Sequence, residues 1–275
     1  MTIRPNADTT LFAAFPDNNF GSNSNLLSGA NGSGLTGRAL IRFDVANQIP
    51  SNAVIQSVAL TVTVVIVPGG GGVASDFDLR RILVNWGEGA GTGNSGSPAT
   101  DGEATWNNRF HPATPWAVPG GNFSNDYSGT VSATMLISGL GSYTFNSTTN
   151  LIADVQSWLL NPATNFGWVL ISEAEDTQFT ARRFGSREDP TNAPVLTVQY
   201  VRPTEIQWIN ATGNQIQFSF LADGGQPYTV QYRDSLTTGN WQNLTNLAPQ
   251  ITTTNVIVFD SYPTNAQRYY RISGF

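Results

Sequence analysis

The stretch 37–63 constrains the fold of this chain more than any other, because it spells out two strands joined by a short connector. In its first part, ALIRFDV, the apolar Leu40, Phe43 and Val45 share one strand with charged residues. After a connector that contains a proline, VIQSVALTVTVVIV carries β-branched residues at nearly every second position. Such alternation is typical of strands that bury one face. The sequence therefore predicts a sheet with one side packed against a core.

Similar strand-like runs recur along the chain and are separated by Gly, Pro and Asn turns. They cover residues 9–15, 39–45, 54–67, 77–84, 131–137, 141–145, 168–172, 179–184 and 195–201. Many short strands of this kind predict an all-β, antiparallel sandwich with jelly-roll-like wiring. Residues 148–160 differ, because their apolar positions have helical spacing, Ser and Thr precede them, and Pro162 follows. We therefore predict one short helix that closes an end of the sandwich.

A domain boundary is expected near Arg202 and Pro203, after the strand-like VLTVQYV. Downstream, IQFSFLA, YTVQYRDSL, NWQNLT, NVIVFD and RYYRISGF again alternate apolar and polar residues. The sequence thus predicts two domains, a large β-sandwich at 1–201 and a second, small β-sandwich at 202–275.

Several motifs carry a family resemblance. Besides RFD and IP in the stretch described first, they are DNNFGSNSNLL (17–27), WGEG (86–89), GEATWN (102–107), LIADVQSWLLNPATNFGWVLIS (151–172) and ARRFGSREDPTNAPVLTVQY (181–200). In this order they resemble the DNRLRE-type (disaggregatase-related) module over 1–201. TVQYRDSLTTGNWQNLT and QRYYRI resemble small fibronectin type III-like domains of exported bacterial proteins. The resemblance implies a carbohydrate-binding or surface protein that is extracellular or attached to the cell surface.

Composition excludes several classes of function. The chain has 275 residues and no cysteine, so it has no disulfide framework and no thiolate metal site. Its basic residues are all arginines, 13 against 19 carboxylates, and the net charge is −6. This balance disfavours nucleic acid and anionic membranes as partners. No apolar run is long enough to insert into a membrane, and residues 1–12 lack the features of a signal peptide.

Few residues suggest catalysis or metal binding. His111 is the only histidine, which disfavours zinc, haem and a Ser-His-Asp triad. Three carboxylates, Glu173, Glu175 and Asp176, follow the strand-like GWVLIS. They are interpreted as a solvated turn or as a structural calcium site, since calcium prefers carboxylate and backbone oxygens. We expect no other cofactor.

Aromatic and arginine side chains are the candidate ligand-binding groups. Sugar rings stack on exposed aromatic faces, and Trp86, Trp106, Trp116 and Tyr127 lie in one long, irregular connection. Trp116 and Tyr127 are expected to be exposed, whereas Trp86 and Trp106 also fit a role as folding anchors. Arg81 and Arg182 belong to Arg-Arg pairs in strands, where one member faces out. An outward arginine suits a uronic-acid carboxylate, and structural pairing is the alternative.

Three functions follow, in order of preference. The first is a non-catalytic, extracellular polysaccharide-binding protein for acidic or neutral glycans. The second is a structural subunit of a surface filament, surface layer or adhesin that self-associates through β edges. The third is a polysaccharide lyase or hydrolase that uses the Glu173–Asp176 carboxylates, or Tyr127 with an arginine.

Overall fold

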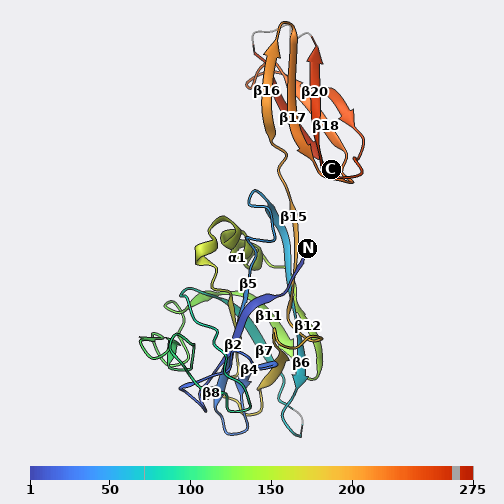
Figure 1. Cartoon of the computed structure of the whole chain (residues 1–275). Helices are drawn as coiled ribbons and strands as arrows, with labels where there is room; N and C mark the ends of the chain where they lie inside the picture. Colours follow the sequence, from blue (N-terminus) through green and yellow to red (C-terminus); the bar gives the residue numbers. More distant parts are fainter. Residues whose placement is uncertain (71, 262–266, 275) are drawn as a thin grey trace. The chain divides into compact units, whose positions relative to one another are not determined.

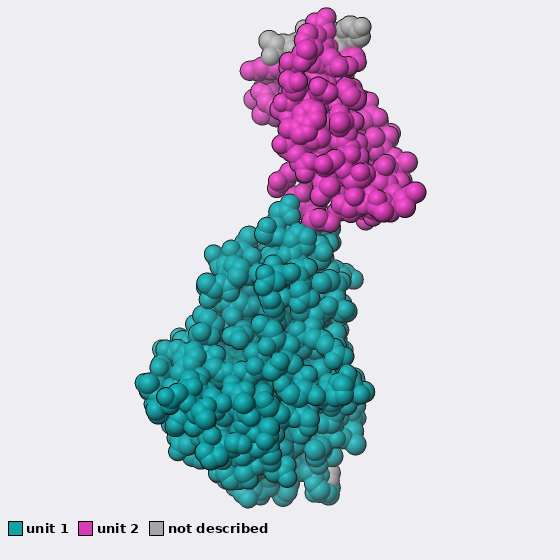
Figure 2. Space-filling view, viewed as in Figure 1, with its two compact units in different colours: residues 1–201 teal, residues 202–275 magenta. Residues whose placement is uncertain are grey.

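The computed structural model describes residues 1–70, 72–261 and 267–274. The chain divides into two compact units, Met1–Val201 and Arg202–Phe275, which are teal and magenta in Figure 2. Each unit has its own hydrophobic core. Antiparallel strands make up most of both units, and α1 (Thr149–Leu160) is the one α-helix among the described residues. The predicted all-β class with a single short helix is therefore confirmed.

Unit 1 is a curled sheet whose two halves pack face to face (Figure 1). The first half contains β1 (Thr2–Ile3), β15 (Val195–Val201), β6 (Val54–Ile66), β12 (Gly141–Phe145) and β14 (Arg182–Gly185). The second half contains β2 (Pro5–Phe12), β5 (Thr36–Phe43), β13 (Trp168–Ser172), β7 (Ser75–Ile82) and β11 (Tyr127–Ile137). The chain crosses repeatedly from one half to the other, as the predicted jelly-roll-like sandwich requires.

Strand β6 shows how the sequence pattern produces this packing. Val58, Leu60 and Val62 are buried, while the residues between them are partly exposed. Successive side chains of a strand point to opposite faces, so this alternation directs one apolar row into the core. Opposite it, side chains of the second half complete the main core, where the rings of Phe77 and Phe184 lie 5.7 Å apart, edge to face.

Strand β4 (Asn25–Ala30) joins the two halves, and it was not predicted from the sequence. It pairs with β14 up to Ser28 and with β5 from Gly29 onward. Gly29 has φ +100°, and a Cβ there would lie 2.8 Å from the carbonyl oxygen of Thr180. Only glycine accommodates both the dihedral and the close approach, so this residue lets one strand serve both halves.

Helix α1 closes one end of the sandwich, as predicted. Its N-cap is Thr148, whose Oγ1 accepts a hydrogen bond of 3.0 Å from the backbone N–H of Leu151. The buried face of the helix includes Trp158, whose ring lies 4.5 Å from that of Trp168 on β13. No helix in the described part of the chain is long and apolar enough to cross a membrane.

The connection between β7 and β11, residues 83–126, covers the outer face of the second half. It contains β8 (Ser97–Pro98), which pairs with β3 (Asn18–Asn19), and the small ladder of β9 (Asn108–Phe110) and β10 (Thr114–Pro115). A second core forms beneath it from Ala7, Leu11, Leu40, Ile82, Trp86, Ala104, Trp116, Tyr127, Val169 and Ile171. This long connection is therefore a packed layer of the domain. The short 3-10 helix η1 (Pro162–Thr164) follows α1.

Unit 2 is the second, small β-sandwich. One sheet contains β16 (Ile206–Thr212), β17 (Gln215–Ala222) and β20 (Thr254–Ser261), and the other contains β19 (Gln242–Leu247), β18 (Tyr228–Arg233) and β21 (Tyr269–Gly274). Between them lie the buried side chains of Phe218, Phe220, Val230 and Val258.

Candidate functional site

The aromatic side chains of the long connection in unit 1 are core residues. We expected Trp116 and Tyr127 to be exposed, and this prediction is wrong, because their exposed fractions are 3% and 0%. Trp86 is 2% exposed, and Trp106 is partly buried against the same core. The outer face of β2, β5 and β13 is apolar, so these rings cover it instead of facing solvent. Their use as folding anchors, the alternative for Trp86 and Trp106, is what the packing shows.

The polar edges of these rings are also used inside the protein. The indole N–H groups of Trp86 and Trp116 donate to backbone carbonyls at 2.8 and 2.9 Å. The hydroxyl of Tyr127 donates to the carbonyl of Gly120 at 2.7 Å. Burial raises the pKa of Tyr127 above its ordinary value, because the phenolate would lose its hydration. This tyrosine neither reaches solvent nor tends to ionise.

The two arginines predicted as ligand-binding groups have partners within unit 1. Arg81 lies over the ring of Trp158, 5.9 Å from its centroid, and its Nη1 lies 3.9 Å from a carboxylate oxygen of Asp154. Arg182 is fully buried, and its guanidinium donates to five backbone carbonyls, among them those of Val73 and Ser138 at 2.8 Å. Arg81 is thus near a carboxylate, as the alternative of structural pairing predicts. Arg182 is buried away from solvent and is bonded to backbone carbonyls instead of a carboxylate.

The three carboxylates predicted as a calcium site do not converge. Glu175 receives two hydrogen bonds from Arg38, at 2.8 and 2.7 Å. Glu173 lies 3.8 Å from Nη2 of Arg80, and the neighbouring carboxylate of Asp78 on β7 raises the pKa of Glu173. Asp176 is exposed and accepts a hydrogen bond from the neighbouring Thr177. Each carboxylate thus has a different partner.

A different acidic group does converge, at the free edge of β2. Among the described residues, Asp8, Glu88 and Glu188 form the one acidic group whose ligand oxygens lie within 4.8 Å of one another. Arg187 sits among them, with Nη2 at 2.9 Å from both Glu88 and Glu188. This cluster was not predicted, because its members are far apart in the chain and meet only when β2 packs beside the 186–188 turn.

Burial controls the protonation of this cluster. Asp8 is 1% exposed, and its desolvation raises the pKa to about 8, although the backbone N–H of Arg187 donates to it at 2.7 Å. The neighbouring carboxylates of Glu88 and Glu188 raise the pKa of Asp8 further. The pKa of Glu88 is also raised, mainly by desolvation. The guanidinium of Arg187 lies within ion-pair distance of Glu88 and Glu188 and offsets part of the negative charge of the cluster.

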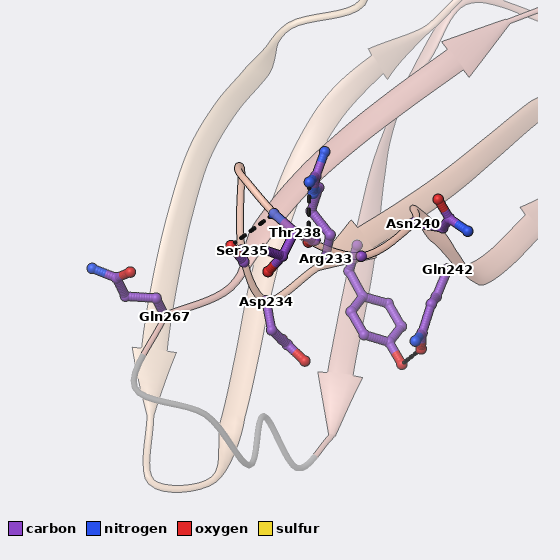
Figure 3. Close-up of a pocket in the computed structure, with 9 residues that line it drawn as sticks. Arg233, Asp234, Ser235, Thr238, Asn240, Gln242 and Gln267 are labelled. Atoms are coloured by element: carbon purple, nitrogen blue, oxygen red, sulfur yellow. Dashed lines mark hydrogen bonds between the residues drawn. The ribbon is translucent and has the colours of Figure 1, made fainter.

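An open cavity of about 650 Å³ lies at one end of unit 2 (Figure 3). It is formed by the end of β18, the connection to β19, the first residue of β19, and Gln267, which lies two residues before β21. The lining residues are Tyr232, Arg233, Asp234, Ser235, Thr238, Gly239, Asn240, Gln242 and Gln267. Figure 3 shows Gln267 and Gln242 on opposite sides of Asp234. The lining thus offers amides, hydroxyls, one carboxylate and one guanidinium around a single hollow.

Hydrogen bonds between residues close in sequence hold the wall of the cavity. The backbone N–H of Thr238 donates to Oγ of Ser235 at 3.2 Å, and Nη2 of Arg233 donates to the carbonyl of Thr238 at 3.1 Å. The hydroxyl of Tyr232 donates to the amide oxygen of Gln242 at 2.6 Å. Nε of Arg233 is buried and donates to no acceptor among the described residues.

Trp241 lies beside this cavity in contact with two arginines. The guanidinium carbons of Arg233 and Arg271 are 5.4 and 4.6 Å from the centroid of its ring. These distances fit cation–π contacts, which orient a guanidinium without using its N–H groups. The sequence predicted no role for Trp241, although the polar turn RDSLTTGNWQ that contains it is typical of a loop that carries function.

Compared with known protein families, the chain matches none, and no curated protein sequence matches it either.

Proposed function

We propose that this chain is a non-catalytic polysaccharide-binding protein of the extracellular space or cell surface, and that the unit 2 cavity receives the glycan. The observation that carries the proposal is the lining of this cavity. Sugars present many hydroxyl groups, each a donor and an acceptor, and planar amide, carboxylate and guanidinium side chains pair with them in defined directions. Asp234, Asn240 and Gln242 supply such groups from the lining of the cavity.

The shape of the cavity sets the expected strength of binding. It is open and polar, so a bound sugar buries little apolar surface and keeps part of its hydration. Water also competes for every hydrogen bond that the sugar forms. We therefore expect weak binding, with dissociation constants on the order of micromolar to millimolar.

The sequence resemblance supports the same function and location. Motifs over 1–201 resemble the DNRLRE-type module, and motifs in unit 2 resemble fibronectin type III-like domains. On this proposal, unit 1 is the structural module that carries unit 2. Its aromatic side chains stabilise the domain and do not contact the glycan.

The proposal of a non-catalytic role rests on where the candidate acids lie. Glu175 is held by Arg38, and Tyr127 is buried with its hydroxyl bonded to Gly120. Neither side chain can approach a glycosidic bond without leaving these contacts. Asp234, the one carboxylate of the cavity lining, receives a hydrogen bond of 2.9 Å from Arg268. A pair of opposed carboxylates, which a glycosidase requires, is not among the lining residues that the structure describes.

The binding test uses affinity electrophoresis of the whole chain in gels that contain neutral or acidic polysaccharides. We expect retardation by at least one polymer. The double variant Asn240→Ala/Gln242→Ala should bind about tenfold more weakly, because it loses two groups that bond to sugar hydroxyls. Gln178→Ala, an exposed amide in unit 1, is the matched control and should bind as the wild type does. Lack of retardation by every polymer would refute the proposal, and release of reducing ends would refute its non-catalytic part.

One observation favours the second candidate function, self-association through a β edge. Among the described strands, β16 pairs only with β17, and six of its seven residues are exposed. Ile209 on this strand is 56% exposed, and no charged side chain interrupts the strand. Long, uncharged edges are templates for pairing with another chain. Light scattering at high concentration should then show oligomers that Ile209→Lys abolishes, while monomers at all concentrations would rule out this mode of assembly.

A further inference from the structure

The outer face of the β19–β18–β21 sheet is positively charged. On the central strand β18, Val230 points into the core, so Gln231 and Arg233 point outward. Arg271 on β21 lies directly opposite Gln231 and donates to its amide oxygen at 2.7 Å. Trp241, just before β19, contacts both arginines. This set, Gln231, Arg233, Trp241 and Arg271, is called the arginine face below.

The arginine face has no counter-charge among the described residues. Nη2 of Arg233 donates to a backbone carbonyl and Nε of Arg271 to an amide, and neither arginine forms an ion pair with a described carboxylate. By contrast, Arg268 is bonded to both Asp234 and Asp260, at 2.9 and 2.8 Å.

The numbers of charged residues in unit 2 explain why Arg233 and Arg271 form no ion pair among the described residues. Residues 202–275 contain four arginines and four carboxylates, although the whole chain has a net charge of −6. Asp223 is paired with Arg202, while Asp234 and Asp260 share Arg268. The fourth carboxylate, Glu205, is exposed and forms no ion pair within the described residues. The positive charge of unit 2 is therefore concentrated on one face, beside the cavity.

The arginine face and the cavity share a residue. Arg233 contributes to the cavity lining, and its guanidinium is in contact with Trp241 on the outer face. A sugar ring in the cavity would therefore present its substituents to Arg233. Arg271 is nearby, because it contacts the same Trp241 ring. The ring of Trp241 holds both guanidinium groups in place, so it is a positioning residue for them.

We propose that the glycan is acidic, and that the arginine face binds the carboxylates of its uronic-acid residues. This inference rests on the proposed function and specifies its ligand class. Guanidinium groups form paired N–H···O hydrogen bonds with carboxylates, and such charge-assisted bonds are stronger than those to neutral hydroxyls. The partly buried Arg233 and the exposed Arg271 offer this geometry to two successive acidic sugars of one chain.

The test compares two polymers with the same backbone, a polyuronate and its carboxyl-reduced, neutral form. Affinity electrophoresis or calorimetry of the whole chain should show at least about tenfold tighter binding of the polyuronate, since each guanidinium–carboxylate pair contributes the equivalent of about one order of magnitude. Arg233→Gln and Arg271→Gln should each remove most of this preference. Arg4→Gln, an exposed arginine of unit 1 whose hydrogen bond goes to a backbone carbonyl, is the matched control and should leave it unchanged.

The outcomes separate the two proposals. Equal binding of both polymers, or Gln variants that keep the preference, would refute the acidic-glycan inference and leave polysaccharide binding in place. Binding of neither polymer, nor of any other polysaccharide, would refute both. Dextran sulfate serves as the third ligand, because it carries charge without carboxylates. If it binds as tightly as the polyuronate, the arginine face is a general polyanion site and the inference is wrong. Circular dichroism of each variant confirms that unit 2 remains folded.

Discussion

Arg38 and Glu175 are joined by two parallel hydrogen bonds, 2.8 Å from Nε to Oε1 and 2.7 Å from Nη2 to Oε2. The remaining Nη1 of Arg38 donates to the carbonyls of Gly120 and Gly121, at 2.9 and 2.8 Å. Arg38 therefore links strand β5, on which it lies, to the long connection of unit 1, and Glu175 holds its guanidinium in place. Glu175 was predicted as a calcium ligand, and in the structure both of its carboxylate oxygens accept hydrogen bonds from Arg38.

Arg38→Leu should lower the free energy of unfolding of unit 1 by about 2 kcal/mol, because it leaves a partly buried carboxylate and two carbonyls without their donor. The side chains of Arg38 and Glu175 are 15% and 22% exposed, so the loss is smaller than for a fully buried pair. Urea denaturation followed by tryptophan fluorescence measures it. Glu173→Gln, at an exposed carboxylate, is the control with little effect. A variant as stable as the wild type would contradict this role of the pair.

The raised pKa of Asp8 should make the stability of unit 1 depend on pH. Its pKa is raised from 3.8 to about 8 in the folded protein, so the folded state binds the extra proton between these values. Stability should therefore fall by several kcal/mol as the pH rises from about 4 to about 8 and level off above it, since each pKa unit corresponds to about 1.4 kcal/mol. Asp8→Asn mimics the protonated acid and should flatten the profile, whereas Asp176→Asn should not. Parallel profiles for the wild type and Asp8→Asn would show that Asp8 ionises normally.

Calcium should have little effect on stability. The expected ligands do not converge, and Arg187 supplies the positive charge in the one acidic cluster that does. We expect the same melting temperature in millimolar calcium and in a chelator. Arg187→Gln removes that charge, so this variant should be less stable, and calcium should restore part of the loss. A rise of several degrees on adding calcium to the wild type would reveal a site of a different kind.

Replacing Arg182 by lysine should strongly lower stability, although the change is conservative. Five backbone carbonyls receive its N–H groups, and the compact ammonium of a lysine cannot reach all of them. Arg182→Lys should therefore destabilise unit 1 by about 3 kcal/mol or more, measured by urea denaturation. Arg81→Lys, at a partly exposed arginine, should cost much less. Equal effects of the two changes would contradict this explanation.

The fold was predictable where a local pattern determines it. Alternation in β6 and helical spacing in α1 fix which side chains enter the core, and both elements were located correctly. Strand β4 was missed because its path depends on Gly29, which has meaning only beside Thr180 in the folded protein. Short-range patterns do not record such contacts.

The candidate site was harder to predict, because aromatic composition does not reveal exposure. Trp116 in unit 1 and Trp241 in unit 2 both lie in loops rich in Gly and polar residues. The first is buried because it lies over an apolar sheet face, and the second is partly exposed because its sheet presents arginines outward. That difference comes from the strands beneath each loop, which are distant in sequence.

The most direct test of glycan binding by unit 2 is a tryptophan fluorescence titration with whichever polysaccharide retards the chain. Ligand at the arginine face changes the surroundings of Trp241, so the wild type should give a saturable signal. Trp241→Phe should lose most of that signal, and Trp208→Phe, at the exposed tryptophan of the opposite sheet, should keep it. An undiminished signal in Trp241→Phe would place the glycan elsewhere and contradict the assignment of binding to this face of unit 2.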